Sequence, residues 1–475
     1  MLDSEWDWFP DDGCGGTSMR LGVLPLARPT FDMGAAQAKL RAMIEKLGGC
    51  GVEILGSCEL LLDDESAANE RNKITASNPD IWVVLQTSFT DATVVTETAQ
   101  CSDLPMMIWA VREPRSGGRL LLNSLCGLNL AAHALGLRGR KFSWIYSDPE
   151  FVDTDHLSAL LSGVAENTTE VSSTPATENV AGRKLADSLR GVCIGQFGCH
   201  PPGFDTCTYD SETLGRIFGI EIKLLTLDDL FDVAKKLGPA QAGDAGGITL
   251  HGLEDVEQGA LDLSLRLAPA LRQLAHGCGL DAIAVRCWPE CFTEYGGAVC
   301  GPVSMLAEEM LPCACESDVY GAISLLTAQR AVAAPVFLAD LVDADQQDDT
   351  VVVWHCGQAP LSMCDHTYEP LAAVHSNRRL PLLCQFPLKP GRVTLSRISK
   401  AHGVHRIVVA AAEMLRRPLA FAGTAGVLRF DRPVQVVLAD IIDGGLEHHF
   451  VIAYGDIRPQ LRGFAAALGL EVMEL

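Results

Sequence analysis

The pattern of predicted strands and helices changes once along this chain, and that change constrains the fold most. Up to about residue 331, short apolar runs alternate with amphipathic helices, as in Leu21–Leu26 followed by a helix from Gly34 to Leu47. In that helix the apolar residues recur every three or four positions. Strands that alternate with helices are typical of parallel sheets with helices on their faces. We therefore predict α/β units for this part of the chain.

Several further strands follow from the same pattern. The first unit contains the runs 21–26, 52–54, 81–85 and 106–110, and the second contains 191–195, 220–225 and 282–287, with helices at 254–276 and 319–331. After residue 331 the runs 336–341, 351–354, 393–398, 406–410, 427–430 and 434–439 are short and separated by turns. The predicted fold class is therefore α/β, with two doubly wound parallel-sheet domains followed by a β-rich, barrel-like C-terminal domain.

The chain divides into four predicted segments. They are a polar leader at 1–17, an N-terminal α/β domain at 18–146, a central α/β domain at 147–331 that carries Glu316, and a β-rich domain at 332–475 that carries Asp340 and His355/His449. A chain of 475 residues is too long for one ordinary hydrophobic core, which agrees with several domains. The Ser- and Thr-rich segment 166–177 is expected to be a surface loop.

Charge and cysteine content exclude several classes of protein. The formal net charge is −23 and no block of Lys and Arg occurs, so we expect no nucleic-acid partner. No run approaches the ~18 apolar residues of a membrane span, so we expect no membrane partner. The acidic N-terminus lacks the basic start of a secretory signal, and we expect a cytoplasmic protein. Its seventeen cysteines are then expected to be reduced thiols, many of them buried.

Ionisable side chains stand at or near the ends of three predicted elements. Glu316 shortly precedes the helix at 319–331, Asp340 lies near the end of one strand, and His355 follows another. Ligand sites of open sheets form at the carboxyl ends of strands. Two carboxylates and an imidazole form a mixed oxygen and nitrogen set, which suits Mn²⁺, Co²⁺, Mg²⁺ or Fe²⁺ better than a thiolate-seeking ion. The sequence thus predicts a divalent-metal site.

A further imidazole is expected from the adjacent residues His448 and His449. Adjacent side chains of an extended segment point to opposite faces, so we expect only one of them to reach a metal and favour His449. Taken alone, each predicted ligand has a simpler explanation, because Asp and Glu often cap helices or turns and a single His is more often a core or surface group. The metal interpretation depends on these residues occurring together.

Sequence motifs in one order along the chain add to this pattern. They are LPLARPTFD at 24–32, AVRCWPE at 284–290, CESDVYGA at 315–322, HCG at 355–357, LKPGRVTLSR at 388–397, GTAG at 423–426 and HHFVIAYGD at 448–456. Together they resemble the L-fucose isomerase-like family, which is related to L-arabinose isomerase. The resemblance implies an aldose–ketose isomerase that acts on a small-molecule sugar through an enediol intermediate.

The resemblance also implies residue roles. It implies a metal, most naturally Mn²⁺, held by Glu316, Asp340 and either His448 or His449, and the arabinose branch would add His355. Glu316 and Asp340 would also be the catalytic acid and base, in an order that the sequence leaves open.

Assembly and sugar contacts are implied as well. The resemblance implies a trimer or hexamer in which the N-terminal domain of a neighbour completes the active site. Candidate sugar contacts are Arg28, Gln86 and Trp288.

Three alternatives stay open. The enzyme could isomerise a modified or anionic sugar such as a sulfonated hexose, because Arg28, Arg286 and Arg397 would suit an anionic group. A metal-dependent aldolase or decarboxylase on a sugar acid would pass through a similar enediolate. A non-catalytic sugar-binding protein could also have two α/β lobes, but it would not need the carboxylates and imidazoles together.

Overall fold

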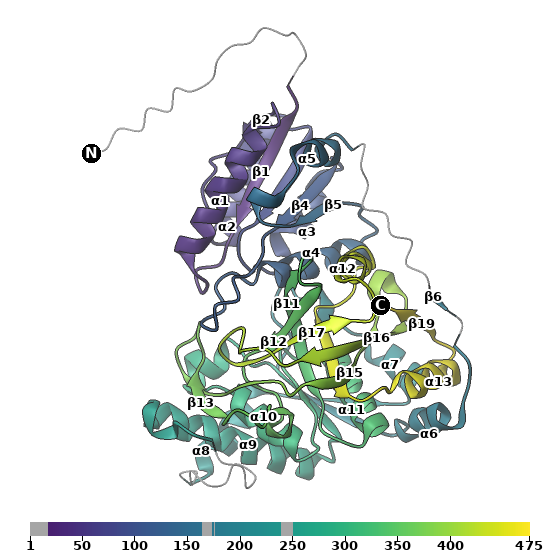
Figure 1. The fold of residues 1–475 in the computed structure, drawn as a ribbon. Coiled ribbons are helices and arrows are strands. Elements are labelled where there is room, and N and C mark those ends of the chain that lie inside the picture. Colours follow the sequence, from purple (N-terminus) through teal and green to yellow (C-terminus); the bar gives the residue numbers. More distant parts are fainter. Residues whose placement is uncertain (1–17, 164–172, 175, 239–249) are drawn as a thin grey trace.

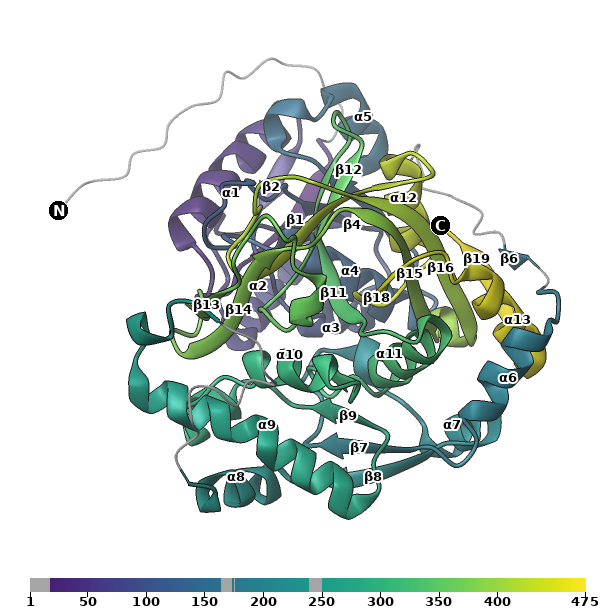
Figure 2. The ribbon, with the colours of Figure 1, turned by 60° about the horizontal axis from the view of Figure 1, so that its bottom comes forward.

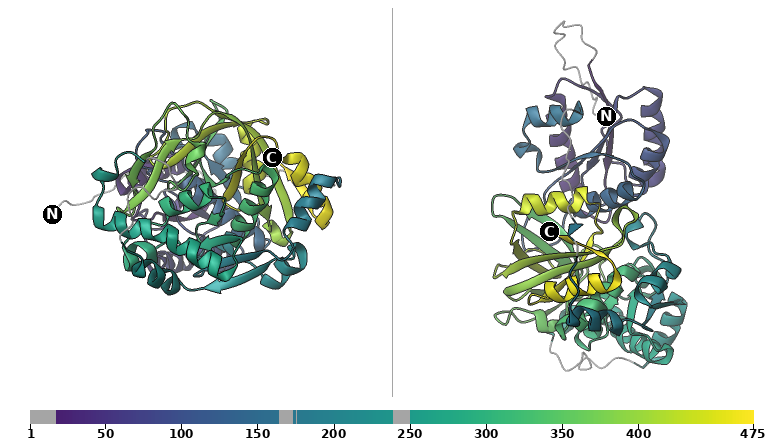
Figure 3. Two further views of the ribbon diagram at one scale, coloured as in Figure 1. Left: turned by 90° about the horizontal axis from the view of Figure 1, so that it is seen from below. Right: turned by 90° about the vertical axis from the view of Figure 1, so that its right-hand side faces the viewer.

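The computed structural model describes residues 18–163, 173–174, 176–238 and 250–475. The N-terminal sheet stands at one end of the molecule, and the central sheet and a barrel lie together at the other (Figures 1 and 3). The leader predicted at 1–17 and most of the loop predicted at 166–177 lie outside the described residues. Among the described helices, none is both long and apolar enough to span a membrane. The described cysteines are free thiols, as predicted.

The first sheet is parallel, with the strand order β2-β1-β3-β4-β5. Its strands are β1 (Arg20–Leu26), β2 (Glu53–Leu55), β3 (Ile81–Gln86), β4 (Met106–Ala110) and β5 (Ser143–Tyr146). Its helices are α1 (Met33–Gly48), α2 (Asp64–Ala76), α3 (Thr93–Cys101), α4 (Ser124–Leu137) and α5 (Thr154–Leu161). Helices cover both faces, which explains why β3 and β4 are buried along their whole length. The strands predicted here are confirmed.

Helix α5 extends the core of this first unit beyond residue 146. Its residues Leu157 and Leu160 belong to the same buried cluster as Leu21 and Met43. The boundaries of the four predicted segments stay a prediction.

The second sheet is also parallel, with the order β10-β9-β7-β8. Its strands are β7 (Cys193–Phe197), β8 (Glu221–Leu225), β9 (Ala282–Val285) and β10 (Cys313–Ala314). The helices of this region are α6 (Val180–Ser188), α7 (Ser211–Phe218), α8 (Leu227–Lys236), α9 (Gln258–Cys278), α10 (Cys300–Glu308) and α11 (Val319–Val332). Because β9 and β10 are parallel neighbours, the segments that follow them, with Trp288 and Glu316, leave the same edge of the sheet.

The third part is a closed barrel. Its wall runs β17-β12-β11-β18-β15-β16 and returns from β16 to β17. These strands are β11 (Phe337–Asp345), β12 (Thr350–His355), β15 (Gly391–Ser399), β16 (Arg406–Leu415), β17 (Thr424–Phe430) and β18 (His449–Tyr454). Strands β13 (Leu371–Val374), β14 (Pro381–Pro387), β19 (Glu471–Glu474) and β6 (Ser173–Thr174) extend the same sheet, and α13 (Arg458–Leu468) packs beside α6. The predicted fold class is therefore confirmed.

Helix α11 lies between the barrel and the second sheet (Figure 2). Its residues Ile323 and Leu326 share one buried cluster with Ala284 of β9 and with Ile398 and Val451 of the barrel. Helix α11 therefore fixes the barrel against the central sheet.

One predicted strand is wrong. Residues 434–439 belong to helix α12 (Val434–Asp443), which packs against α4 and the barrel. The β-branched residues suggested a strand, but the buried residues Val434, Val437, Leu438 and Ile441 recur at helical spacing. The helical spacing of these apolar residues therefore outweighed the strand preference of their side chains.

A buried carboxylate joins the first unit to the barrel. Asp343 of β11 accepts hydrogen bonds from Arg112 at 2.8 Å, Arg115 at 2.6 Å and the hydroxyl of Tyr146 at 2.8 Å. Its side chain is fully buried, whereas both arginines are partly exposed. This carboxylate therefore holds three groups of the first unit on the barrel wall.

We expect Asp343→Asn to lower the free energy of unfolding by about 3 kcal/mol, because it leaves two clustered guanidinium groups without their shared anion. Urea unfolding followed by circular dichroism measures the change. The control Asp187→Asn breaks an exposed ion pair with Arg190 and is expected to cost under about 1 kcal/mol. Equal losses in the two variants would contradict the role of Asp343.

Candidate active site

A cavity lies where the three parts of the molecule meet. The space between its lining residues is about 790 Å³, a figure that includes the part open to solvent. The first unit contributes Arg28, Phe31, Phe89 and Asn123, the central unit Trp288 and Glu316, and the barrel region Asp340, His355, Arg378 and His448. Residues far apart in the sequence therefore face one space.

Glu316 is held at this cavity by two hydrogen bonds. Trp288 Nε1 donates to Oε1 at 3.0 Å, and His448 Nε2 donates to Oε2 at 2.9 Å. Glu316 and Ser317 both adopt left-handed backbone angles, with φ of 59° and 53°, which turn the chain sharply from β10 into α11. Burial alone would raise the pKa of Glu316, but the bond from His448 and the neighbouring imidazoles lower it to about 2. The carboxylate is therefore ionised.

Asp340 and His449 meet because the barrel register makes them direct cross-strand partners. Asp340 Oδ1 lies 3.5 Å from His449 Nε2, and Glu316 Oε2 lies 3.7 Å from the same nitrogen. Burial raises the pKa of Asp340 to about 7, and its Oδ1 has no hydrogen-bond partner among the described residues. The structure thus brings the three predicted ligands together. It places Asp340 in the middle of β11 rather than near a strand end.

His449 is oriented by Asp318, a carboxylate that the sequence analysis did not select. His449 Nδ1 donates to Asp318 Oδ2 at 2.9 Å, so Nε2 is the nitrogen that faces Glu316 and Asp340. Asp318 also caps α11 through the backbone N–H of Gly321 and pairs with Arg397 at 2.5 and 3.0 Å. A carboxylate behind an imidazole is the arrangement that fixes metal-binding histidines. Asp318 directly precedes α11, a position at which a helix cap could have been expected, but its partners Arg397 and His449 are distant in the chain.

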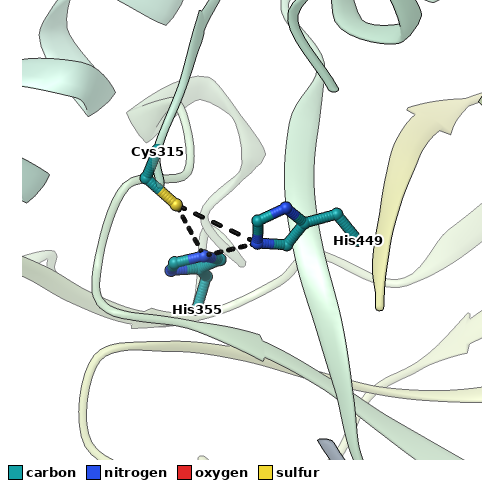
Figure 4. A group of neighbouring side chains, drawn as sticks. All are labelled: Cys315, His355 and His449. Atoms are coloured by element: carbon teal, nitrogen blue, oxygen red, sulfur yellow. Dashed lines mark hydrogen bonds between the residues drawn. The ribbon is translucent and has the colours of Figure 1, made fainter. Parts of the chain in front are cut away.

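Cys315, His355 and His449 form a second group of possible metal ligands (Figure 4). His355 Nε2 lies 3.3 Å from His449 Nε2 and 3.0 Å from Cys315 Sγ. The backbone N–H of Cys356 donates to His355 Nδ1 at 2.8 Å. Burial lowers the pKa of His355 well below its usual value, so the ring is neutral and carries its proton on Nε2. In this state His355 donates a hydrogen bond into the cluster, and its role as a metal ligand stays a prediction.

His448 lies on the same side as His449, with their ring centroids 3.8 Å apart. The expectation that the two imidazoles face opposite ways is therefore wrong. Strand β18 begins only at His449, so His448 precedes the strand and does not follow its alternation. Burial and the neighbouring His449 lower the pKa of His448 to about 4, and its Nε2 is engaged by Glu316.

Two of the three predicted sugar contacts line the cavity, and the third does not. Arg28 and Trp288 line the cavity, but Gln86 does not. Gln86 is 1% exposed, and its side-chain nitrogen donates to the carbonyl of Ser88 and the hydroxyl of Thr90. The prediction for Gln86 is corrected accordingly, because its side chain supports the loop after β3.

Two of the arginines proposed to face an anion are engaged elsewhere. Arg397 is fully buried against Asp318, and Arg286 Nε bonds to Glu290 at 2.7 Å. Neither lines the cavity, so this part of the prediction is wrong. Arg378 lines the cavity and was missed, because nothing in its local sequence distinguishes it from a surface arginine.

Comparisons with known proteins cover almost the whole chain. The family described as "Fucose/sulfoquinovose isomerase, N-terminal domain" matches residues 22–166. A sulfoquinovose isomerase of Alkalicoccus urumqiensis is 30% identical over 460 residues, which are 95% of this chain and 98% of that protein. Proteins of the same name from Clostridium sp. (strain MSTE9) and Priestia aryabhattai are 28% and 26% identical, over 95% and 94% of this chain and 98% and 97% of theirs. The chain therefore belongs to the fucose/sulfoquinovose isomerase family of aldose–ketose isomerases.

Proposed function

We propose that this protein is a divalent-metal-dependent isomerase that interconverts the aldose and ketose forms of a sulfonated hexose. The observation that carries the proposal is the approach of Glu316 and Asp340 to one nitrogen of His449 inside the cavity. The relatives named sulfoquinovose isomerase favour a sulfonated hexose, the alternative of the sequence analysis, over an unmodified aldose. Their names do not favour an aldolase, a decarboxylase or a non-catalytic sugar-binding protein.

The residues fit a divalent cation. Within the described ranges, Asp340 Oδ1 is buried without a hydrogen-bond partner, which is costly for a carboxylate unless a positive charge compensates it. Carboxylate oxygens combined with an imidazole suit Mn²⁺ or a similar ion. Glu316, Asp340 and His449 would hold the ion, and His448 would steady Glu316. When bound, such an ion supplies Lewis-acid stabilisation of negative charge on the sugar oxygens, on the order of several kcal/mol.

The carboxylates are proposed to differ in their roles. Isomerisation needs a proton removed from C2 and a proton delivered to C1. Both oxygens of Glu316 accept hydrogen bonds, from Trp288 and His448, whereas Oδ1 of Asp340 accepts no hydrogen bond from the described residues. We therefore assign the proton transfer to Asp340, for which general acid–base catalysis typically contributes about 10²–10⁴-fold.

Aromatic rings form one wall of the cavity. The rings form a row in which each contacts the next, with centroids 5.5–6.1 Å apart, in the order Phe31, Phe89, Phe204 and Trp288. This wall would limit the entry of water beside the carboxylates. The proton taken from C2 would then be less exposed to exchange with solvent before a proton reaches C1. The first unit of the same chain contributes two of these rings, and a trimer or hexamer stays a prediction.

Metal removal tests the cofactor. We expect EDTA treatment followed by desalting to abolish interconversion of the sulfonated aldose and ketose, and Mn²⁺ or Co²⁺ to restore it. Chromatographic separation of the two sugars measures the activity, and elemental analysis verifies that the metal has gone. Full activity in verified metal-free protein would exclude the metal-dependent part of the proposal.

Replacement of the central carboxylate tests the site. We expect Glu316→Gln to lower kcat by at least about 10²-fold, because the neutral amide can neither hold a cation nor keep the cluster charged. The fold should persist, since the amide oxygen still accepts from Trp288 Nε1. Glu294→Gln, at an exposed position, is the control and should keep normal activity. An active Glu316→Gln enzyme would rule out the assignment.

The role of Asp318 can be separated from its contribution to stability. Asp318→Asn weakens the orientation of His449, and we expect Mn²⁺ affinity to fall about 10–100-fold. Arg397→Met removes the ion pair but keeps the bond from His449 to Asp318, so it should lower stability with a smaller loss of affinity. Calorimetric titration with Mn²⁺ and thermal unfolding measure the two effects. Unchanged Mn²⁺ affinity in Asp318→Asn would show that Asp318 has only a structural role.

A further inference from the structure

Among the residues that the structure describes, Arg378 is a cation of the cavity that pairs with no carboxylate. The guanidinium of Arg378 lies over the rings of Trp288 and Phe292, with 4.8 and 5.4 Å from its central carbon to the ring centroids. Stacking engages the face of a guanidinium and leaves its N–H edge available. Within the part of the chain that the structure describes, the side chain of Arg378 makes no hydrogen bond and no ion pair. A half-buried cation of this kind is available to an incoming anion.

The other arginines near the cavity are already satisfied. Arg28 pairs with Asp91 at 2.6 Å, and Arg119 donates to Asn377 and to the carbonyl of Thr30. Burial lowers the pKa of Arg378 and the nearby Arg28 lowers it further, whereas the nearby cysteines Cys287, Cys356 and Cys300 act in the opposite direction. An anion placed there would therefore relieve both the desolvation of Arg378 and its repulsion by Arg28.

Trp288 sets the position of this charge relative to the carboxylates. Its Nε1 donates to Glu316, while its ring carries Arg378 at 4.8 Å and Arg28 at 5.5 Å. The two arginines and the proposed metal-binding carboxylate are thus separated by one indole. A hexose in its open-chain form can place C1 and C2 at the Glu316 end and its far terminus at the arginines.

We propose that Arg378 binds the anionic terminal group of the sugar through its N–H edge and thereby makes the site selective for anionic sugars. The planar guanidinium matches two oxygens of a sulfonate, as it matches those of a carboxylate or phosphate. A neutral sugar would leave Arg378 desolvated and unpaired, so the same residue also disfavours neutral hexoses. The inference rests on the proposed function, because it identifies where the sulfonate of that substrate binds.

The test compares two substrates in two variants. The substrates are a 6-sulfonated aldohexose and the same hexose without the sulfonate, and the variants are Arg378→Met and the control Arg379→Met, whose side chain is exposed. We expect Arg378→Met to lower kcat/KM for the sulfonated sugar by about 10²-fold, mainly through KM. Its kcat/KM for the uncharged hexose should stay the same or rise. Arg378→Lys should recover part of the preference, and Arg379→Met should match the wild type.

Each outcome is informative. Equal losses for both sugars in Arg378→Met would mean that Arg378 only supports Trp288, and would overturn the inference. A wild-type preference for the sulfonated sugar that survives in Arg378→Met would leave the proposed function standing and also overturn the inference. A wild-type enzyme that isomerises only the uncharged hexose would instead reject the proposed substrate. Calorimetric binding of the sulfonated sugar to EDTA-treated protein gives a readout without turnover, and Arg378→Met should weaken that binding about 10²-fold.

Discussion

The geometry of the candidate site depends on one buried ion pair, between Asp318 and Arg397. Asp318 begins helix α11, Arg397 comes from barrel strand β15, and His449 begins barrel strand β18. Charges with no exposure to solvent are costly unless each is fully hydrogen-bonded, and Asp318 achieves this with a backbone N–H, a guanidinium and an imidazole. The imidazole is thereby fixed by the same contacts that dock the helix on the barrel. The contacts that form when the helix packs on the barrel therefore also orient His449.

The remaining groups are placed by backbone register rather than by mobile loops. The β11–β18 pairing sets Asp340 opposite His449, and the left-handed turn at Glu316 brings the other carboxylate over the same nitrogen. Sites built on strands and helix starts hold their geometry more closely than sites built on loops. The cavity wall contributed by the first unit is anchored separately, through Asp343 on the barrel.

Much of this arrangement could be predicted from the sequence, and the failures have physical causes. Apolar runs gave the strands of all three parts, because a buried strand needs such a run. The segment 434–439 failed because its residue types favour a strand while their spacing is helical. Glu316 was found because it precedes a predicted helix within a matching motif, and Asp340 because it lies near the end of a predicted strand. Arg397 was misassigned and Arg378 missed, because the partner of an arginine is decided by residues far away in the chain.

The indole of Trp288 has a consequence for the length of the substrate. One of its edges is tied to Glu316 and its face supports two guanidinium groups, so the distance between the two ends of the site is set by a rigid covalent ring system. The indole cannot change its own dimensions, so this distance is fixed. Under the proposed binding mode, this rigid ring would make the site sensitive to the number of carbons between C1 of the sugar and its anionic group.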